Sequence, residues 1–496
     1  MRGTIKSFMV LCLLATALRS QEKSTPMKAV QRLNHAPVNT EVLQVYLPRP
    51  TRVNLKNGLT VLVLERHKLP TITAMLWIKT GALNDPKELP GLASFTADML
   101  REGASKLTSE QISQELDSIG AELNAEAQFG QGVSRITASG LTDSADRLME
   151  LMSDVVINPS FPESELQKYK KRRQPHLEEE RSDPGFLVRE KFYRAVYQNF
   201  PASVVAPSAQ SLAAVRTEDL RRYHDKYFVP DNAILGMAGD LTIDQAKALA
   251  EKFFGASHWQ TAAPSGTSLP PIDAPNAKKI YLIDRPGSVQ TEIMVGNVAL
   301  KRIDPEYVPL RVLNRVLGAT FASRLFLNLR EEKGYTYGAY SGITANIYPG
   351  VFAARTEVRN EVTDGSMHEL LRELSRIRDE PVPQEELEES SRSIVADFAL
   401  SLEQTEELLE DWMTVEYYGL PTNYWDRYPD EVGKVTPEKI QQIARKYIDL
   451  DHLQIVCVGD GKQIRDVLQK YGPIEVIDTD GNPVEGLGAK ARSHTD

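Results

Sequence analysis

The chain carries one pattern of residues twice, at an offset of about 220 positions. Residues 220–240 and 440–460 both read as an amphipathic helix ending in Lys-Tyr, then an apolar strand and a Gly-Asp turn. Residues 142–166 and 363–387 match as well, each leading from Thr-Asp through a helical pattern to a proline and a Glu-Leu pair. Several matches at one offset indicate two homologous halves.

Within each half the patterns of strands and helices alternate. Asn57-Gly58, set between β-prone runs over residues 53–64, is a hairpin signal. The expected strands are 71–79, 280–283 and 292–295, and the expected helices are 143–157, 310–317 and 366–378. This mixture predicts an α+β fold, with an antiparallel-rich sheet packed with helices in each half.

Composition places the domain boundaries. Residues 260–277 are rich in proline and small polar residues, which predicts a linker between a first domain over 47–259 and a second over 278–485. Residues 21–46 and 486–496 are expected to be mobile ends. With 25% charged and 41% hydrophobic residues, a net charge of −10 and no long basic run, the chain has the composition of a globular protein and shows no sign of a nucleic-acid partner.

The N-terminus has the pattern of a secretory leader. Arg2, Lys6 and Arg19 flank an apolar run over 8–18 that is too short to span a bilayer. We therefore expect a signal peptide over 1–20, a periplasmic or secreted protein and no membrane span after its removal; a mitochondrial presequence is the alternative. Cys457 would then be the only cysteine, which leaves no partner for an intramolecular disulfide.

Two segments resemble a known family. Residues 91–103, GLASFTADMLREG, and 321–340, FASRLFLNLREEKGYTYGAY, are similar to the insulinase/pitrilysin family of zinc metallopeptidases. The two-domain branch, which includes the mitochondrial processing peptidase and bacterial periplasmic homologues, is the most similar. The resemblance implies two α+β halves enclosing a chamber.

Active members of that family carry an inverted zinc motif, H-x-x-E-H, on a helix of the first half. Two histidines four residues apart share one helix face and bind zinc, while the glutamate serves as base for the zinc-bound water. Here the matching positions are Ser94, Ala97 and Asp98. The remaining ligand would fall near His176, or at Glu178 in another register. We expect no zinc site in this chain.

The second half keeps a different pair of family residues, Arg330 and Tyr337, with Gly334 between them. The resemblance implies that they face the metal across the chamber, the tyrosine donating to the oxyanion and the arginine holding substrate. The spacing fits if Arg330 ends a helix, Gly334 caps it and Tyr337 opens a strand. Residues 120–128 resemble the edge strand along which substrates lie, with Asn124 and Ala125 central.

These residues predict a subunit that lacks its own zinc but supplies Arg330 and Tyr337 to a heterodimeric zinc metallopeptidase. The expected partners are a homologous chain with an H-x-x-E-H motif, which would hold the zinc, and a peptide substrate. The alternatives are a non-catalytic scaffold or peptide-binding member of the same fold. A self-sufficient zinc peptidase is disfavoured by the missing base and ligands.

Overall fold

The computed structural model describes residues 47–260 and 269–484. The predicted signal peptide (1–20), the predicted mobile ends (21–46 and 486–496) and residues 261–268 of the predicted linker lie outside the described residues.

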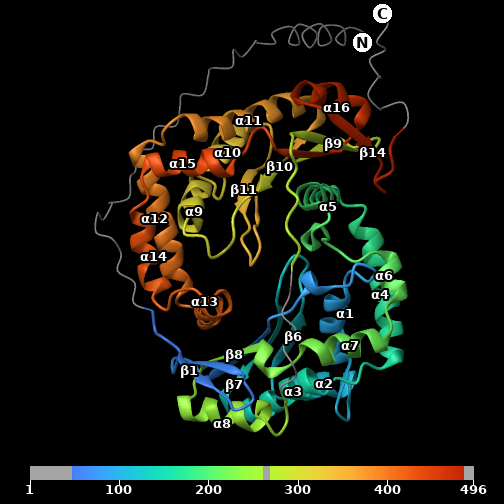
Figure 1. Cartoon of the computed structure of the whole chain (residues 1–496), viewed down its shortest axis with the longest axis vertical. Coiled ribbons are helices and arrows are strands. Elements are labelled where there is room, and N and C mark those ends of the chain that lie inside the picture. The colour runs from blue at the N-terminus through green and yellow to red at the C-terminus, as the bar shows by residue number, and fades with distance from the viewer. Residues whose placement is uncertain (1–46, 261–268, 485–496) are drawn as a thin grey trace, which may run out of the picture. The chain divides into compact units, whose positions relative to one another are not determined.

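The first half is built on a six-stranded sheet (Figure 1). Its strand order is β1 (Thr51–Asn54), β2 (Thr60–Glu65), β8 (Ala233–Gly239), β3 (Thr71–Ile78), β7 (Ser134–Leu141) and β6 (Glu122–Glu126). Neighbouring strands are antiparallel except β2 and β8, which run parallel. A separate short pair joins β4 (Gly103–Ala104) and β5 (Leu107–Thr108).

The second half repeats this sheet. Its order is β11 (Ala339–Ile343), β12 (Val351–Arg359), β10 (Gln290–Val298), β13 (Gln454–Gly459), β9 (Lys279–Asp284) and β14 (Ile474–Ile477). In chain order, β9, β10, β11, β12 and β13 take the places of β2, β3, β6, β7 and β8. The pattern that repeats in the sequence is therefore a repeat of topology, and the predicted fold class is confirmed.

Each half carries its helices in the same order (Figure 1). The first half has α1 (Leu92–Met99), α2 (Ser109–Ser118), α3 (Ala145–Ile157), α4 (Glu163–Glu180), α5 (Pro184–Tyr197), α6 (Ala209–Ala214), α7 (Thr217–Tyr227) and α8 (Ile243–Phe254). The second half has α9 (Tyr307–Leu317), α10 (Arg324–Phe326), α11 (Thr363–Asp379), α12 (Gln384–Ser401), α13 (Thr405–Tyr418), α14 (Tyr424–Gly433), α15 (Pro437–Tyr447) and α16 (Gly461–Leu468). The strands and helices expected from the sequence correspond to β3, β9, β10, α3, α9 and α11; the expected strand 71–79 runs one residue past β3, and the expected helix 143–157 begins two residues before α3.

The Asn57-Gly58 signal forms the turn that was predicted. β1 and β2 pair antiparallel with Asn54 opposite Thr60. Gly58 has φ 91°, a left-handed conformation that favours glycine. The Asn57 side chain donates to the carbonyl oxygens of Phe254 and Trp259 at 2.7 and 2.9 Å, which fastens the turn to the end of α8.

Helices α5 and α13 are exchanged between the halves. α5 belongs to the first half but packs on β10 and β13 of the second sheet, with Phe192 wholly buried beside Val456. α13 belongs to the second half but packs on β8 of the first sheet, and its Trp412 donates from the indole N–H to the Pro48 carbonyl at 3.0 Å. Each sheet therefore buries one face against a helix supplied by the other half.

Candidate functional site

Helix α1, which carries the zinc-motif positions, is fixed at its start by one carboxylate. Asp85 accepts hydrogen bonds from the backbone N–H groups of Gly91 and Ala93 at 2.7 and 2.8 Å. Burial raises the pKa of Asp85 to about 7, although these two hydrogen bonds act in the opposite direction. Gly91 takes φ 99°, and a Cβ there would lie 2.9 Å from Pro207. The N-terminal end of α1 is therefore fixed by the Asp85 hydrogen bonds and by the lack of space for a side chain at residue 91.

A hollow of about 500 Å³ opens beside α1 and receives residues from both halves. Ser94 and Asp98 reach it from α1, and Glu126 from the end of β6. Arg173 of α4 and residues 344–346 of the second half complete the part of its lining that matters here. Two of the zinc-motif positions, Ser94 and Asp98, therefore share one hollow with the end of the edge strand.

Asp98 is held by a tyrosine. Tyr169 of α4 donates from its hydroxyl to Asp98 Oδ2 at 2.6 Å. The Asp98 side chain is accessible to water from the hollow, but protein surrounds it on the other sides. This partial desolvation raises the pKa of its carboxyl group. The Tyr169 hydrogen bond and the charge of Arg173 oppose that shift, whereas Glu102 and Glu126 add to it.

The other zinc-motif positions are not arranged as a metal site. Ala97 is 1% exposed, so the position of the family's base lies in the core. His176 is not among the residues that line the hollow; its side chain is 67% exposed and lies 3.7 Å from Glu179. Glu178 accepts from Gln174 at 3.0 Å on the same helix. In residues 47–260 and 269–484, no group of three or more His, Cys, Asp or Glu side chains could hold a metal ion.

The sequence did not single out the α4 residues that do reach this site. Tyr169, Arg173 and Glu180 are spaced four and seven residues apart, which places them on one helix face. Arg173 pairs with Glu180 at 2.9 Å, and both line the hollow. In the sequence, the basic run over 168–173 is typical of a solvated helix face with local ion pairs. The helical spacing of Tyr169 and Arg173 relative to Glu180 is the sequence signal that could have identified these three residues.

The predicted substrate strand is an edge strand. β6 pairs with β7 on one side and has no second neighbour among the described strands. Asn124 and Ala125 lie at its centre, and Arg101 donates to Asn124 Oδ1 at 3.5 Å. An unpaired row of backbone N–H and C=O groups can accept an extended peptide as a further strand.

Arg330 and Tyr337 belong to the segment between α10 and β11. Arg330 is in a π-helical segment, Leu327–Glu332, with its guanidinium carbon 4.7 Å from the Phe326 ring centroid. Gly334 takes φ 64° and donates to the Arg330 carbonyl, which is the expected helix end. Tyr337 is 89% exposed, and the strand that we expected it to open begins at Ala339. Neither residue lines the hollow.

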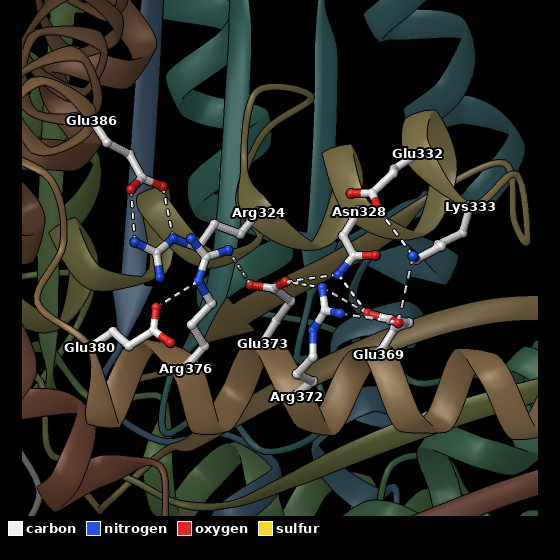
Figure 2. A network of polar contacts seen from close by, with 10 residues as sticks. All are labelled: Arg324, Asn328, Glu332, Lys333, Glu369, Arg372, Glu373, Arg376, Glu380 and Glu386. Atoms are coloured by element: carbon white, nitrogen blue, oxygen red, sulfur yellow. Dashed lines mark hydrogen bonds and ion pairs between the residues drawn. The ribbon is translucent and has the colours of Figure 1, made fainter. Parts of the chain in front are cut away.

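A buried polar network fastens the segment that carries Arg330 to α11. Figure 2 shows Asn328 beside Glu369 and Glu373, to which its amide donates at 3.0 and 2.7 Å. Arg324 forms two bonds to Glu386, at 2.8 and 2.7 Å, on the next helix. Glu373 is 1% exposed and is compensated by Arg372 and Arg376. The network fastens the π-helical segment to α11, and the Arg330 side chain of that segment is 43% exposed.

Two homologous α+β units that share a hollow are the architecture that the resemblance to metallopeptidases implies, and the described residues form no metal-binding group in that hollow. Comparison with family models agrees: residues 60–207 match the insulinase family (peptidase family M16), and residues 214–394 match the peptidase M16 inactive domain. The chain belongs to the insulinase family, M16. Among the described residues, no helix has the length and apolar character needed to cross a membrane.

The relatives are of two kinds by name. The chain is 24% identical over 409 residues to an uncharacterized zinc protease, YmxG, of Bacillus subtilis, covering 81% of this chain and 96% of that one. It is 21% identical over 415 residues to a non-peptidase homolog of Helicobacter pylori, covering 80% and 91%. Among solved structures, the peptidase M16 inactive domain from Pseudomonas fluorescens has a TM-score of 0.77 at 24% identity, covering 83% of this chain and 98% of that one.

Proposed function

We propose that this protein is the zinc-free subunit of a two-chain zinc metallopeptidase. Its hollow and the β6 edge hold an extended peptide, while Arg330 and Tyr337 act on the peptide at the zinc site of a homologous H-x-x-E-H chain. The observation that carries the proposal is that Asp98, to which Tyr169 donates, lines the hollow, whereas Arg330 and Tyr337 are not among its lining residues.

The exposure of Tyr337 supports a role in contact with another chain. A tyrosine that is 89% exposed buries little of its ring within its own protein. Phe321, which is 68% exposed, contacts the ring of Phe326, over which the Arg330 guanidinium lies, so exposed aromatic area also adjoins Arg330. Aromatic residues and arginine are enriched at interfaces because they combine large apolar area with directed polar contacts.

Reconstitution tests the proposal. The full chain and a purified H-x-x-E-H homologue are assayed singly and mixed, with an internally quenched, unstructured peptide as substrate. We expect cleavage by the mixture alone. Loss of one oxyanion donor lowers kcat by roughly a hundred-fold or more, so Tyr337→Phe should do the same in the mixture, and Arg330→Ala should raise KM.

The matched control is Arg359→Ala, which should leave the activity of the mixture unchanged. Arg359 is also an exposed arginine of the second half, and its one ion pair among the described residues, to Glu361, is long at 3.8 Å. Full activity of the mixture with Tyr337→Phe would contradict the proposal. We further propose that the leader predicted over 1–20 exports this chain from the cytoplasm; finding the chain in the cytoplasmic fraction would refute that part.

Capture of peptides without cleavage is the second candidate, and the open β6 edge favours it. If it is correct, the full chain alone binds an extended peptide, and Ala125→Pro removes a backbone donor from β6 and weakens that binding. No mixture with an H-x-x-E-H homologue then cleaves the peptide. Cleavage that depends on Tyr337 would rule this candidate out.

A further inference from the structure

A second cavity, of about 430 Å³, lies where the exchanged helix α5 meets the second sheet. Lys191, Arg194 and Gln198 line it from α5 and its C-terminal end. Residues 275–279, which lead into β9, line it from the second half. The lining contains four cationic side chains and no acidic one, and nothing in the peptidase chemistry above uses it.

Two lysines at this cavity share one carboxylate. Glu475 accepts from Lys279 Nζ at 2.5 Å and from Lys191 Nζ at 3.5 Å. Both ammonium groups also lie over the Tyr281 ring, 4.3 Å for Lys191 and 4.8 Å for Lys279 from its centroid. Burial lowers the pKa of Lys191, and the charges of Lys279 and Arg194 lower it further against the attraction of Glu475. The positive charge here is under-compensated.

Arg194 and Lys278, the other two cationic side chains of the lining, also have little compensating negative charge. Arg194 is 3.7 Å from Glu190, which also pairs with Arg181 at 3.4 Å. No ion pair joins Lys278 to a carboxylate of the described residues. Gln198, at the end of α5, takes φ 50°, an uncommon conformation for a residue other than glycine. Four cationic side chains therefore line the cavity, and among the described residues only Glu475 and Glu190 form ion pairs with any of them.

We propose that this cavity binds a small anion with several negative charges, held by Lys191, Arg194 and Lys278 through phosphate or carboxylate oxygens. Its volume is that of a small-molecule site, and charge-assisted hydrogen bonds from lysine and arginine are the usual means of holding such oxygens. The anion contacts α5 and the segment entering β9 together. Binding would therefore join the exchanged helix to the second half and raise the Tm of the whole chain.

The test uses the full chain and inorganic tripolyphosphate, titrated by calorimetry at constant ionic strength, with citrate as the second arm. We expect one saturable site per chain. Lys278→Ala and Arg194→Ala should each weaken binding about ten-fold, since each removes a charge-assisted contact. Lys247→Ala, at an exposed lysine of α8, is the control and should leave binding unchanged. Arg194 is 63% exposed, so its truncation leaves the core intact.

A substitution that removes negative charge near the cavity should strengthen anion binding and gives a second test. Glu475→Gln frees Lys191 and Lys279 and should tighten binding several-fold, whereas Glu438→Gln, at an exposed glutamate of α15, should not. If the chain binds tripolyphosphate but not citrate, the natural ligand is a phosphate compound. If it binds both equally, the ligand class includes carboxylates. The proposal is overturned if neither anion saturates, or if Lys278→Ala weakens binding no more than Lys247→Ala.

Discussion

Asp98 stands at the position where the family resemblance implies a zinc-binding histidine in active members, and here it accepts a hydrogen bond from Tyr169. A hydrogen bond to the charged form of a carboxyl group favours that form. Tyr169→Phe should therefore raise the pKa of Asp98 further, which carboxyl-carbon NMR of aspartate-labelled protein would follow. Tyr193→Phe, in the same hollow but without a hydrogen bond to Asp98, is the control. An unchanged titration of Asp98 in Tyr169→Phe would show that the bond does not form.

The same residues predict metal content. Ser94 offers a neutral hydroxyl, which is a weak zinc ligand, and His176 does not line the hollow. After equilibration with zinc and dialysis, the full chain should hold far less than one zinc per molecule, and a chelator should leave its Tm unchanged. Metal analysis and a thermal melt check this. A value near one zinc per chain would mean that the hollow forms a metal site in solution.

Glu292 predicts a pH dependence of stability. It lies directly opposite Glu357 on the paired strands β10 and β12, and burial together with this like charge raises its pKa to about 7. Between its unfolded pKa near 4.5 and this value the folded state binds more protons, so its contribution to stability falls as pH rises through that window.

Glu292→Gln should therefore raise the free energy of unfolding by roughly 2 kcal/mol at pH 8 and change it little at pH 4.5. Urea unfolding at the two pH values measures the difference. Glu361→Gln, at an exposed glutamate of the same half, should show no such pH dependence. A Glu292→Gln benefit that is equal at both pH values would contradict the titration argument.

At the scale of elements, the sequence predicted what depends on local pattern. The duplication predicted two like halves, and Asn57-Gly58 predicted the β1–β2 turn. The family resemblance of residues 120–128 predicted a strand at a sheet edge, which is β6. Amphipathic spacing says that a helix has an apolar face but not which sheet covers it. The exchange of α5 and α13, and the contact of Tyr169 with Asp98, are long-range pairings that no local pattern specifies.

The exchanged helix α5 should be essential to the second sheet. Phe192 is wholly buried between α5 and that sheet, and a buried Phe→Ala change costs about 3–5 kcal/mol because it leaves a cavity. Phe192→Ala should lower the free energy of unfolding by this amount in urea. Leu400→Ala, at a residue 68% exposed, should cost less than about 0.5 kcal/mol. Equal costs would mean that α5 adds little to the second sheet.

At the scale of the whole molecule, the exchange makes the halves dependent on each other. The face of each sheet that the exchanged helix covers would be exposed if the halves separated, and such large apolar faces are costly in water. The covalent link between the halves should therefore matter less than α5 and α13.

A specific protease site inserted at residue 265 gives a chain that can be cut between the halves. After cutting, the two fragments should elute together in gel filtration and unfold in a single thermal transition. The same cut in Phe192→Ala should weaken that association. If the fragments of the unsubstituted chain elute separately, each half folds on its own, and the exchange contributes little to holding the molecule together.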